Sequence, residues 1–271
     1  MRIGFIGDIV GKPGRLMLKK HLSRLRQEHF LDLVIGNYEN TSHGFGLTRK
    51  NADELFGCGI DVMTGGNHSF DKKEIFELFE TYPLIRPMNY PEASPGKGLL
   101  RVRVGAYDVA VLNLMGHYTM PMVDNPFTTI APVVASLRAE GIRHIVVDMH
   151  AEASSEKNVL LHMLKEDVSA ILGTHTHVGT DDLQVSQGCA YVTDVGLTGC
   201  YDGVIGMDKA VPLRRFLTGL GGHHDIPDNC KSILQMIVFE LDVEGRCIGA
   251  EKIKIYDDHP KIVTQAWKED Q

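Results

Sequence analysis

Five groups of carboxylate, amide and imidazole side chains each follow a short apolar segment of the sequence. They are Asp8, Glu39-Asn40, Asn67-His68, His150 and His175-Thr176-His177. Side chains of these types bind Mn, Fe or Zn, and none of the groups contains a cysteine. A carboxylate such as Glu39 has two oxygens and can bridge two cations about 3.5–4 Å apart, as two-metal hydrolases require. The residue types therefore indicate a metal site of the kind used for hydrolysis.

Each group also has a simpler interpretation when it is taken alone. Asp8 could be an Asx-turn or helix-capping residue. Glu39-Asn40 and Asn67-His68 could be solvated turns, and a buried His150 could be a hydrogen-bonded core histidine. The His175-Thr176-His177 pattern is only moderately specific. The joint occurrence of all five groups, each at the end of an apolar segment, favours the metal site.

The elements that must position these residues alternate between strands and helices. Expected strands cover 2–7, 33–36, 61–64, 144–149 and 170–173, and expected helices cover 12–30, 48–57, 72–80, 129–140 and 154–166, with Thr48 capping the second helix and Ser154 or Ser155 the last. Later strands are expected at 191–195, 234–243 and 248–256, and a hairpin joins 99–104 to 109–114. Because ligands bind outside the carboxyl ends of strands in open α/β sheets, the five groups could converge on one place.

The order of these elements predicts an α/β fold with mixed sheets and helices outside. The segment 82–98 contains four prolines and is expected to lack regular structure. The composition on its two sides does not differ, so we expect one domain over residues 1–271.

The composition excludes some classes of protein and leaves phosphate ligands open. The chain has 271 residues, 43% hydrophobic and 23% charged, which is typical of a globular protein and not of a disordered or fibrous one. Its 28 basic and 35 acidic side chains give a net charge of −7, which argues against broad nucleic-acid binding. Bound metal ions could still supply positive charge for a phosphate.

The cysteines and the apolar segments bear on the cellular compartment. The five cysteines are scattered and form no C-x-x-C pair, so we expect a reducing compartment and no disulfide framework. There is no apolar stretch of about 18 residues and no leader-like start, which predicts neither a membrane span nor a signal peptide. A cytoplasmic protein is expected.

The motifs resemble, in order, those of the calcineurin-like metallophosphoesterases. More narrowly, the chain resembles the bacterial 2′,3′-cyclic-nucleotide 2′-phosphodiesterase branch. The resemblance covers residues 5 to about 210 and rests on Gly7-Asp8-Ile9-Val10-Gly11, Glu39-Asn40, Gly66-Asn67-His68, 150–157, His175-Thr176-His177 and 193–199. This chain departs from the wider superfamily at two positions. The superfamily has a histidine at the position of Val10 and a bridging aspartate motif at the position of Glu39-Asn40. Both departures are features of the narrower branch, in which Asn40 compensates for the absent histidine.

The resemblance implies a four-layer αββα sandwich of two facing mixed sheets, with two transition-metal ions at one edge. One ion would be held by Asp8, Glu39, Asn40 and His177. The second would be held by Glu39, Asn67, His150 and His175. The ions would be divalent or mixed-valence, with Fe or Mn favoured and Zn an alternative. Asp194 and Thr198 would support the site from behind, and Glu152, Ser154 and Lys157 would cap and orient the helix that follows His150.

The same resemblance implies the reaction. A hydroxide shared by the two ions would attack phosphorus, and His68 would protonate the departing 2′-oxygen, so that a small 2′,3′-cyclic nucleotide becomes a 3′-nucleotide. Two alternatives stay open: hydrolysis of another phosphoester, and an RNA-associated regulatory protein in which turnover is secondary. Association into a homo-oligomer is also left open.

Overall fold

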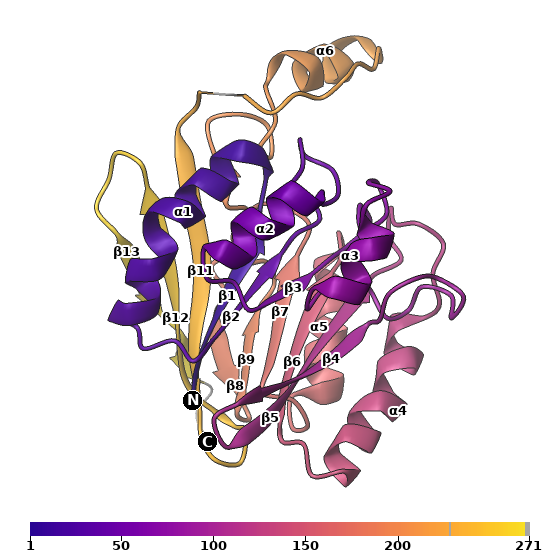
Figure 1. Ribbon diagram of the computed structural model, residues 1–271, viewed down its shortest axis with the longest axis vertical. Coiled ribbons are helices and arrows are strands. Elements are labelled where there is room, and N and C mark those ends of the chain that lie inside the picture. The colour runs from indigo at the N-terminus through magenta and orange to yellow at the C-terminus, as the bar shows by residue number, and fades with distance from the viewer. Residues whose placement is uncertain (228, 269–271) are drawn as a thin grey trace.

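Two mixed β-sheets pack face to face in the computed structural model, which describes residues 1–227 and 229–268 (Figure 1). The first sheet has the order β13-β12-β11-β1-β2-β3, with β10 paired to β11. Its strands are β1 (Arg2–Asp8), β2 (Leu33–Asn37), β3 (Val62–Thr64), β10 (Gly199–Cys200), β11 (Ser232–Leu241), β12 (Cys247–Tyr256) and β13 (Ile262–Gln265). The second sheet has the order β14-β8-β9-β7-β6-β5-β4. Its strands are β4 (Leu99–Val104), β5 (Tyr107–Met115), β6 (His144–His150), β7 (Ala170–Thr174), β8 (Gln184–Ser186), β9 (Cys189–Val192) and β14 (Trp267–Lys268).

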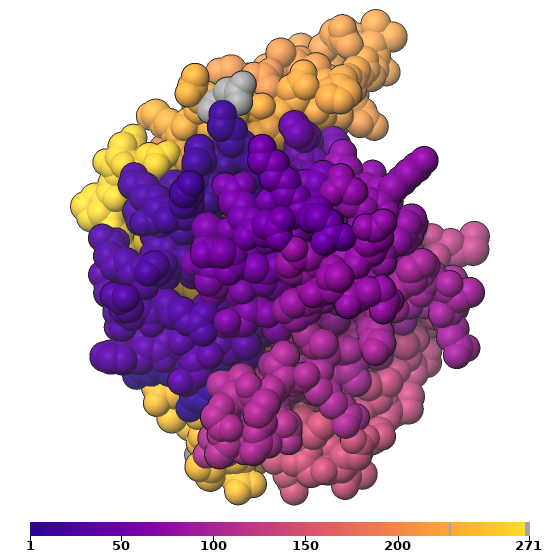
Figure 2. Space-filling view, in the orientation of Figure 1, coloured from indigo at the N-terminus to yellow at the C-terminus, as the bar shows by residue number. Residues whose placement is uncertain are grey.

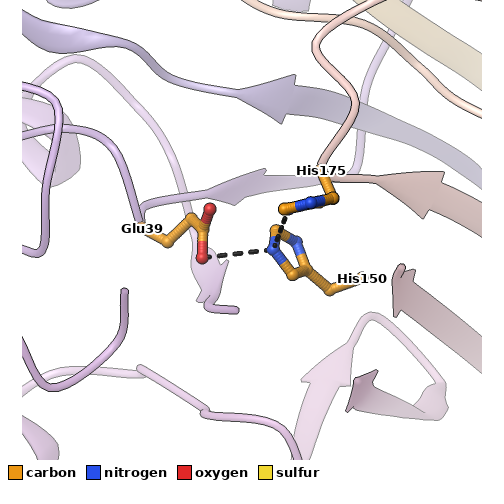
Figure 3. A group of neighbouring side chains, drawn as sticks. All are labelled: Glu39, His150 and His175. Atoms are coloured by element: carbon orange, nitrogen blue, oxygen red, sulfur yellow. Dashed lines mark hydrogen bonds and ion pairs between the residues drawn. The ribbon is translucent and has the colours of Figure 1, made fainter. Parts of the chain in front are cut away.

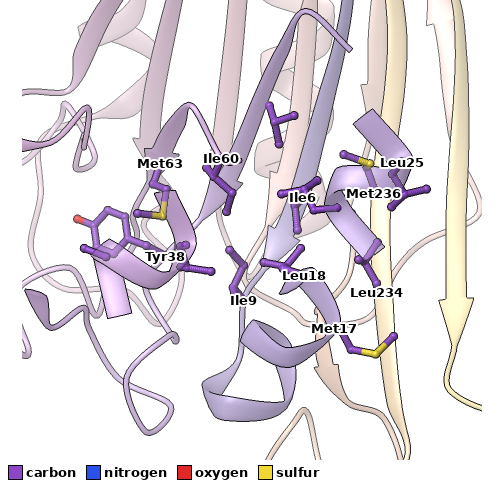
Figure 4. Packing of buried hydrophobic residues seen from close by; sticks show 14 of the residues in the cluster. Ile6, Ile9, Met17, Leu18, Leu25, Tyr38, Ile60, Met63, Leu234 and Met236 are labelled. Carbon is purple, nitrogen blue, oxygen red and sulfur yellow. The ribbon is translucent and has the colours of Figure 1, made fainter. Parts of the chain in front are cut away.

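Helices cover the outer face of each sheet. Against the first sheet lie α1 (Gly11–Glu28), α2 (Arg49–Gly57) and α3 (Ile75–Thr81), and against the second lie α4 (Pro126–Ala139) and α5 (Ser154–Leu164). Three apolar clusters fill the spaces between these layers. The cluster under α1 and α2 includes Ile6, Leu18 and Met236 (Figure 4), and the cluster between the sheets includes Phe5 and Val146. The four-layer αββα sandwich is therefore confirmed.

The inner strands of both sheets run parallel, which sends their carboxyl ends to one edge. β1, β2 and β3 pair in parallel, as do β5, β6, β7 and β9. All seven residues of β6 are buried, as expected for a parallel strand covered on both faces. Polar residues that follow these strands therefore lie at one edge of the sandwich.

Several details differ from expectation. Ser154 or Ser155 was expected to cap the N-terminus of α5. Ala153 occupies the N-cap position instead and no side chain caps this helix, so the prediction is wrong. The helix expected at 129–140 begins earlier, at Pro126, because Asn125 Oδ1 accepts a 3.0 Å hydrogen bond from Phe127 N. The helix α6 (Ala210–Thr218) and the short strands β8, β10, β13 and β14 were not foreseen.

Where the sequence predicted no disulfide framework, the structure has one disulfide, between Cys200 and Cys230, and leaves the other three cysteines free. The 30-residue separation of the bonded pair has no sequence signature. The two cysteines meet because β10 pairs with β11, which places Cys200 opposite Ser232.

Among the helices in the described part of the chain, none has the length and apolar character needed to cross a membrane.

Candidate metal centre

The imidazole of His150, at the end of β6, is the meeting point of three polar side chains from other elements. Its Nε2 lies 3.2 Å from Glu39 Oε2, 2.9 Å from Asn67 Oδ1 and 3.1 Å from His175 Nδ1 (Figure 3 shows Glu39, His150 and His175). Glu39 follows β2, Asn67 follows β3 and His175 follows β7. Residues up to 136 positions apart in the chain thus present ligand atoms to one point.

A second group of ligand atoms lies on the other side of Glu39, around Asp8 at the end of β1. His177 Nε2 is 3.1 Å from Asn40 Oδ1 and 4.0 Å from Asp8 Oδ1. Ligand atoms of Asp8, Glu39 and His177 all lie within 4.8 Å of one another, and so do those of Glu39, His150 and His175. Glu39 belongs to both groups. The structure therefore brings together all seven side chains expected as ligands, with one carboxylate common to two candidate sites.

Hydrogen bonds behind His150 orient its ring. Thr174 Oγ1 donates to Asp148 Oδ1 at 2.7 Å, so the same hydroxyl oxygen accepts from His150 Nδ1–H at 2.9 Å. Thr64 Oγ1 donates to the other oxygen of Asp148 at 2.5 Å. This chain of bonds places a proton on Nδ1, so that in the neutral ring the lone pair is on Nε2, which faces Glu39. Metal-binding histidines are characteristically held in this way.

Equivalent contacts orient His177 and Asn40. His177 Nδ1 donates to the carbonyl of Ile205 at 2.7 Å, and Asn40 Nδ2 donates to the carbonyl of Gly44 at 2.9 Å. Each side chain therefore turns its acceptor atom, Nε2 or Oδ1, into the site. The sequence did not reveal these carbonyl partners, because no side chain identifies them.

The cluster holds more acceptor atoms than hydrogen-bond donors, and this imbalance tests whether a metal fits. Asp8 Oδ1 is buried and has no hydrogen-bond partner among the described residues, while its other oxygen accepts from His175 N at 3.1 Å. His150 Nε2 faces the oxygens of Glu39 and Asn67 and can donate one proton at most to them. Burying acceptor atoms that have neither a hydrogen-bond donor nor a cation lowers the stability of the fold. Cations would satisfy all of these acceptors, so the donor set fits a pair of metal ions.

Without a metal, a proton on His150 takes the place of the cation. Burial opposes the charged ring, but the carboxylates of Glu39, Asp8 and Asp148 outweigh it and raise the pKa of His150 to about 9. Burial likewise opposes ionisation of Glu39, but His150 lowers the pKa of that carboxyl to about 2. For Asp8, burial is the largest effect and raises the pKa.

Metal binding is therefore expected to release a proton near neutral pH. Below pH 9 the ion must displace the proton of His150, so the apparent affinity should rise about tenfold per pH unit from 7 to 9 and level off above 9. An ordinary histidine would give this transition near pH 6.5. Calorimetric titration of the metal-free protein with Mn²⁺, in buffers of different ionisation enthalpy, measures the protons released. Release of none at pH 7 would contradict the assigned charge state.

The loop that carries His175 and His177 adopts a backbone that needs support. Both residues have positive φ, 99° and 65°, which is uncommon outside glycine. Asp194 Oδ2 accepts from Thr176 N at 3.1 Å and from Lys157 Nζ at 3.0 Å, and Lys157 Nζ also donates to the Thr174 carbonyl at 2.9 Å. The buried Lys157–Asp194 pair thus braces this loop, so Lys157 does more than orient its own helix.

Two acidic side chains contact site histidines from outside the cluster. Asp71 Oδ2 lies 2.8 Å from His68 Nδ1, and Glu152 Oε2 lies 3.1 Å from His175 Nε2. Sequence reasoning missed Asp71, although its position three residues after His68 was a usable signal. Glu152 was expected to orient a helix, and the structure places its carboxylate on a candidate ligand instead.

Gly66 leaves the space in which Glu39 and His150 face each other. A Cβ at this position would overlap Glu39 Oε2 and the imidazole of His150. Gly66→Ala should therefore displace ligand atoms, reduce bound metal below two ions per chain and lower turnover about 100-fold or more, since misplaced catalytic groups cost this much. Metal analysis and phosphodiesterase assays measure both effects.

Gly57→Ala is the matched control for this variant. Gly57 has nothing within 4 Å of an added Cβ, so the variant should keep its metal and its turnover within about twofold of the parent protein. A Gly66→Ala protein with two ions and normal turnover would show that Glu39 and His150 need not keep their positions.

A cavity of about 470 Å³ opens over the cluster. Glu39, Asn40, His68, His175 and His177 form one wall. The other wall comes from the segment that contains α6. A ligand of nucleotide size can therefore reach the candidate ligand atoms from this side.

Comparisons with known proteins agree with this geometry. A family model described as "YmdB-like protein" matches residues 5–253. The chain is 42% identical over 262 residues to the 2′,3′-cyclic-nucleotide 2′-phosphodiesterase of Bacillus subtilis, covering 96% of this chain and 98% of that protein. A phosphatase from Mycoplasma pneumoniae superposes with a TM-score of 0.90 at 34% identity, covering 96% of this chain and 95% of that one. A 5′-nucleotidase precursor from Thermus thermophilus shares the fold at 12% identity, with a TM-score of 0.53 and coverage of 98% of this chain and 55% of that one. The chain belongs to the YmdB-like family and has the metallophosphoesterase fold.

Proposed function

We propose that this protein is a metal-dependent phosphodiesterase that hydrolyses 2′,3′-cyclic nucleotides to 3′-nucleotides. The observation that carries the proposal is the convergence of Glu39, Asn67 and His175 on His150 Nε2, next to a buried Asp8 Oδ1 that has no hydrogen-bond partner among the described residues. The substrate class is supported by the 42% identity to a Bacillus subtilis protein named for this activity.

In this proposal, one ion is held by Asp8, Glu39, Asn40 and His177, and the other by Glu39, Asn67, His150 and His175. When bound, the ions would supply Lewis-acid chemistry that activates water and offsets the charge of the phosphate. The donors are oxygens and imidazole nitrogens with no thiolate, which favours iron or manganese and also permits zinc. The protein's own contribution is to hold these donors rigidly through the hydrogen bonds of Thr174, Asp148 and Ile205.

His68 is proposed as the general acid. Its Nδ1 is engaged by Asp71 at 2.8 Å, which leaves Nε2 to donate a proton. The ring packs edge-on against Phe45, with centroids 4.9 Å apart, and it lines the cavity beside Glu39. From this position His68 would protonate the 2′-oxygen as its bond to phosphorus breaks, which leaves the phosphate on the 3′-oxygen.

The proposed activity can be tested with parallel substrates. The metal-reconstituted protein is assayed on 2′,3′-cyclic AMP, 3′,5′-cyclic AMP and p-nitrophenyl phosphate, and the products of the first are separated by chromatography. We expect the highest kcat/KM for 2′,3′-cyclic AMP, with 3′-AMP as the product and loss of turnover after chelation. Equal activity on all three substrates, or 2′-AMP as the product, would overturn the proposed substrate or the proposed bond cleavage.

A further inference from the structure

The second wall of the cavity is built by residues 201–227, which we call the cap segment. It follows β10, and the disulfide between Cys200, at the end of β10, and Cys230, just before β11, fixes it to the first sheet. Figures 1 and 2 show it as an orange lobe that projects beyond the sandwich. Val204, Ile205, Met207, Pro212, Arg215, Phe216 and His224 of this segment line the cavity, opposite the candidate metal ligands.

The base of the cap segment is fixed to the metal centre. Ile205 supplies the carbonyl that accepts from His177 Nδ1, and an added Cβ on Gly44 would meet the buried side chain of Met207. Gly44 in turn supplies the carbonyl that orients Asn40. The start of the segment therefore has a defined position relative to the ligands, and α6 follows within a few residues.

The helix α6 presents apolar side chains that no other part of the described chain covers. Pro212 is the only buried residue of this helix, whereas Phe216 is 87% and Leu217 is 81% exposed. Phe216 lines the cavity, and Leu217 does not. A largely exposed phenylalanine ring beside a polar metal cluster is unexplained by folding, because it buries little area in this structure.

The two neighbouring arginines of α6 also differ. Arg214 Nη2 donates to the Gly221 carbonyl at 2.6 Å, which ties down the end of the helix. The Arg215 side chain makes no hydrogen bond or ion pair with the residues that the structure describes, and it lines the cavity. Arg215 thus offers an uncompensated guanidinium group opposite the metal ligands, as expected of a group that binds an anion.

We infer that α6 is the nucleoside-recognition element of the site: Phe216 stacks on the base, and Arg215 binds the phosphate from the side opposite the metals. This inference rests on the proposed function and extends it. The candidate metal ligands can account for recognition of a phosphate. The apolar lining of the cavity comes from Phe45, which packs against His68, and from the cap segment, where Phe216 offers a largely exposed ring. Aromatic rings stack on nucleobases with little regard to sequence, so the site would accept several bases and discriminate against cyclic phosphodiesters that lack one.

The test compares 2′,3′-cyclic AMP with glycerol 1,2-cyclic phosphate, which has the same five-membered phosphodiester ring and no base. Phe216→Ala should raise KM for 2′,3′-cyclic AMP about 5- to 150-fold, the range expected for loss of one stacked base. It should leave KM for the glycerol compound, kcat and the metal content within twofold. Leu217→Ala is the matched control and should change none of these quantities.

Arg215→Gln should raise KM for both substrates, because both carry the phosphate. Lys209→Gln removes an exposed cation next to α6 that does not line the cavity, and it should change neither KM. Equal KM increases for both substrates in Phe216→Ala, or none, would overturn the inference. So would a change in molecular mass by sedimentation with unchanged KM, which would assign Phe216 to a contact between copies of the chain. If the parent protein turns over neither substrate, the proposed function itself fails, and that outcome is distinct from failure of the Phe216 variant alone.

Discussion

Glu39→Ala is expected to release both metal ions and to lower kcat at least about 1,000-fold. Glu39 is the only carboxylate common to both candidate groups of ligands, so its removal weakens both sites at once. Metal ions contribute several kcal/mol of charge stabilisation to phosphoryl chemistry, and each 1.4 kcal/mol or so corresponds to a tenfold change in rate. Elemental analysis of the purified variant, together with turnover of 2′,3′-cyclic AMP, measures the two effects.

Two further variants separate the shared role of Glu39 from simple misfolding. Glu39→Gln keeps the shape of the side chain and removes its charge, so it should fold and still lose metal. Glu156→Gln changes another buried carboxylate, whose Oε1 accepts from His117 N at 2.7 Å and which lies outside both groups of candidate ligands. It should retain two ions. Retention of two ions by folded Glu39→Ala protein would refute the common carboxylate.

His68→Ala is expected to lower kcat on 2′,3′-cyclic AMP by about 10²- to 10⁴-fold while both ions stay bound, since a positioned general acid contributes this much. The imidazole of His68 is not among the clustered ligand atoms. Its backbone N–H, which donates to Glu39 Oε2 at 3.0 Å, is kept in the variant. Steady-state kinetics and metal analysis on the same preparation test both statements.

The leaving group gives this prediction a sharper form. A p-nitrophenyl ester releases an acidic phenol that needs little protonation, so His68→Ala should lose much less activity on bis(p-nitrophenyl) phosphate than on the cyclic nucleotide. Asp71→Asn keeps the imidazole but weakens its 2.8 Å partner, and should show a smaller loss with the same dependence on leaving group. An equal loss on both substrates would assign His68 to binding instead of proton transfer.

The sequence predicted the main strands and the ligand loops because their physical signals are local. Strands such as β1 and β6 are short apolar runs buried on both faces, and each ends at a polar residue. Parallel pairing then brings Asp8 and His150 to one edge of the sandwich. The order of apolar and polar segments therefore sufficed to predict that side chains such as Asp8 and His150 could lie close together.

Other features depend on contacts between distant segments and left no local pattern. The carbonyl of Ile205 behind His177 could not be foreseen, because any residue supplies a carbonyl. The Cys200–Cys230 pairing required knowledge that β10 lies beside β11. The helix α6 was missed although Pro212 falls in its first turn, where proline is compatible with a helix. Its apolar residues do not face a core, so they were not connected with any packed element.

The central claim is that two metal ions share the carboxylate of Glu39, and a crystal structure of the metal-loaded protein tests it most directly. Diffraction data collected on both sides of the metal absorption edge locate each ion independently of the protein atoms. We predict two anomalous peaks, one beside Asp8, Asn40 and His177 and the other beside Asn67, His150 and His175, with Glu39 between them. A single peak, or two peaks of which Glu39 contacts only one, would contradict the shared carboxylate.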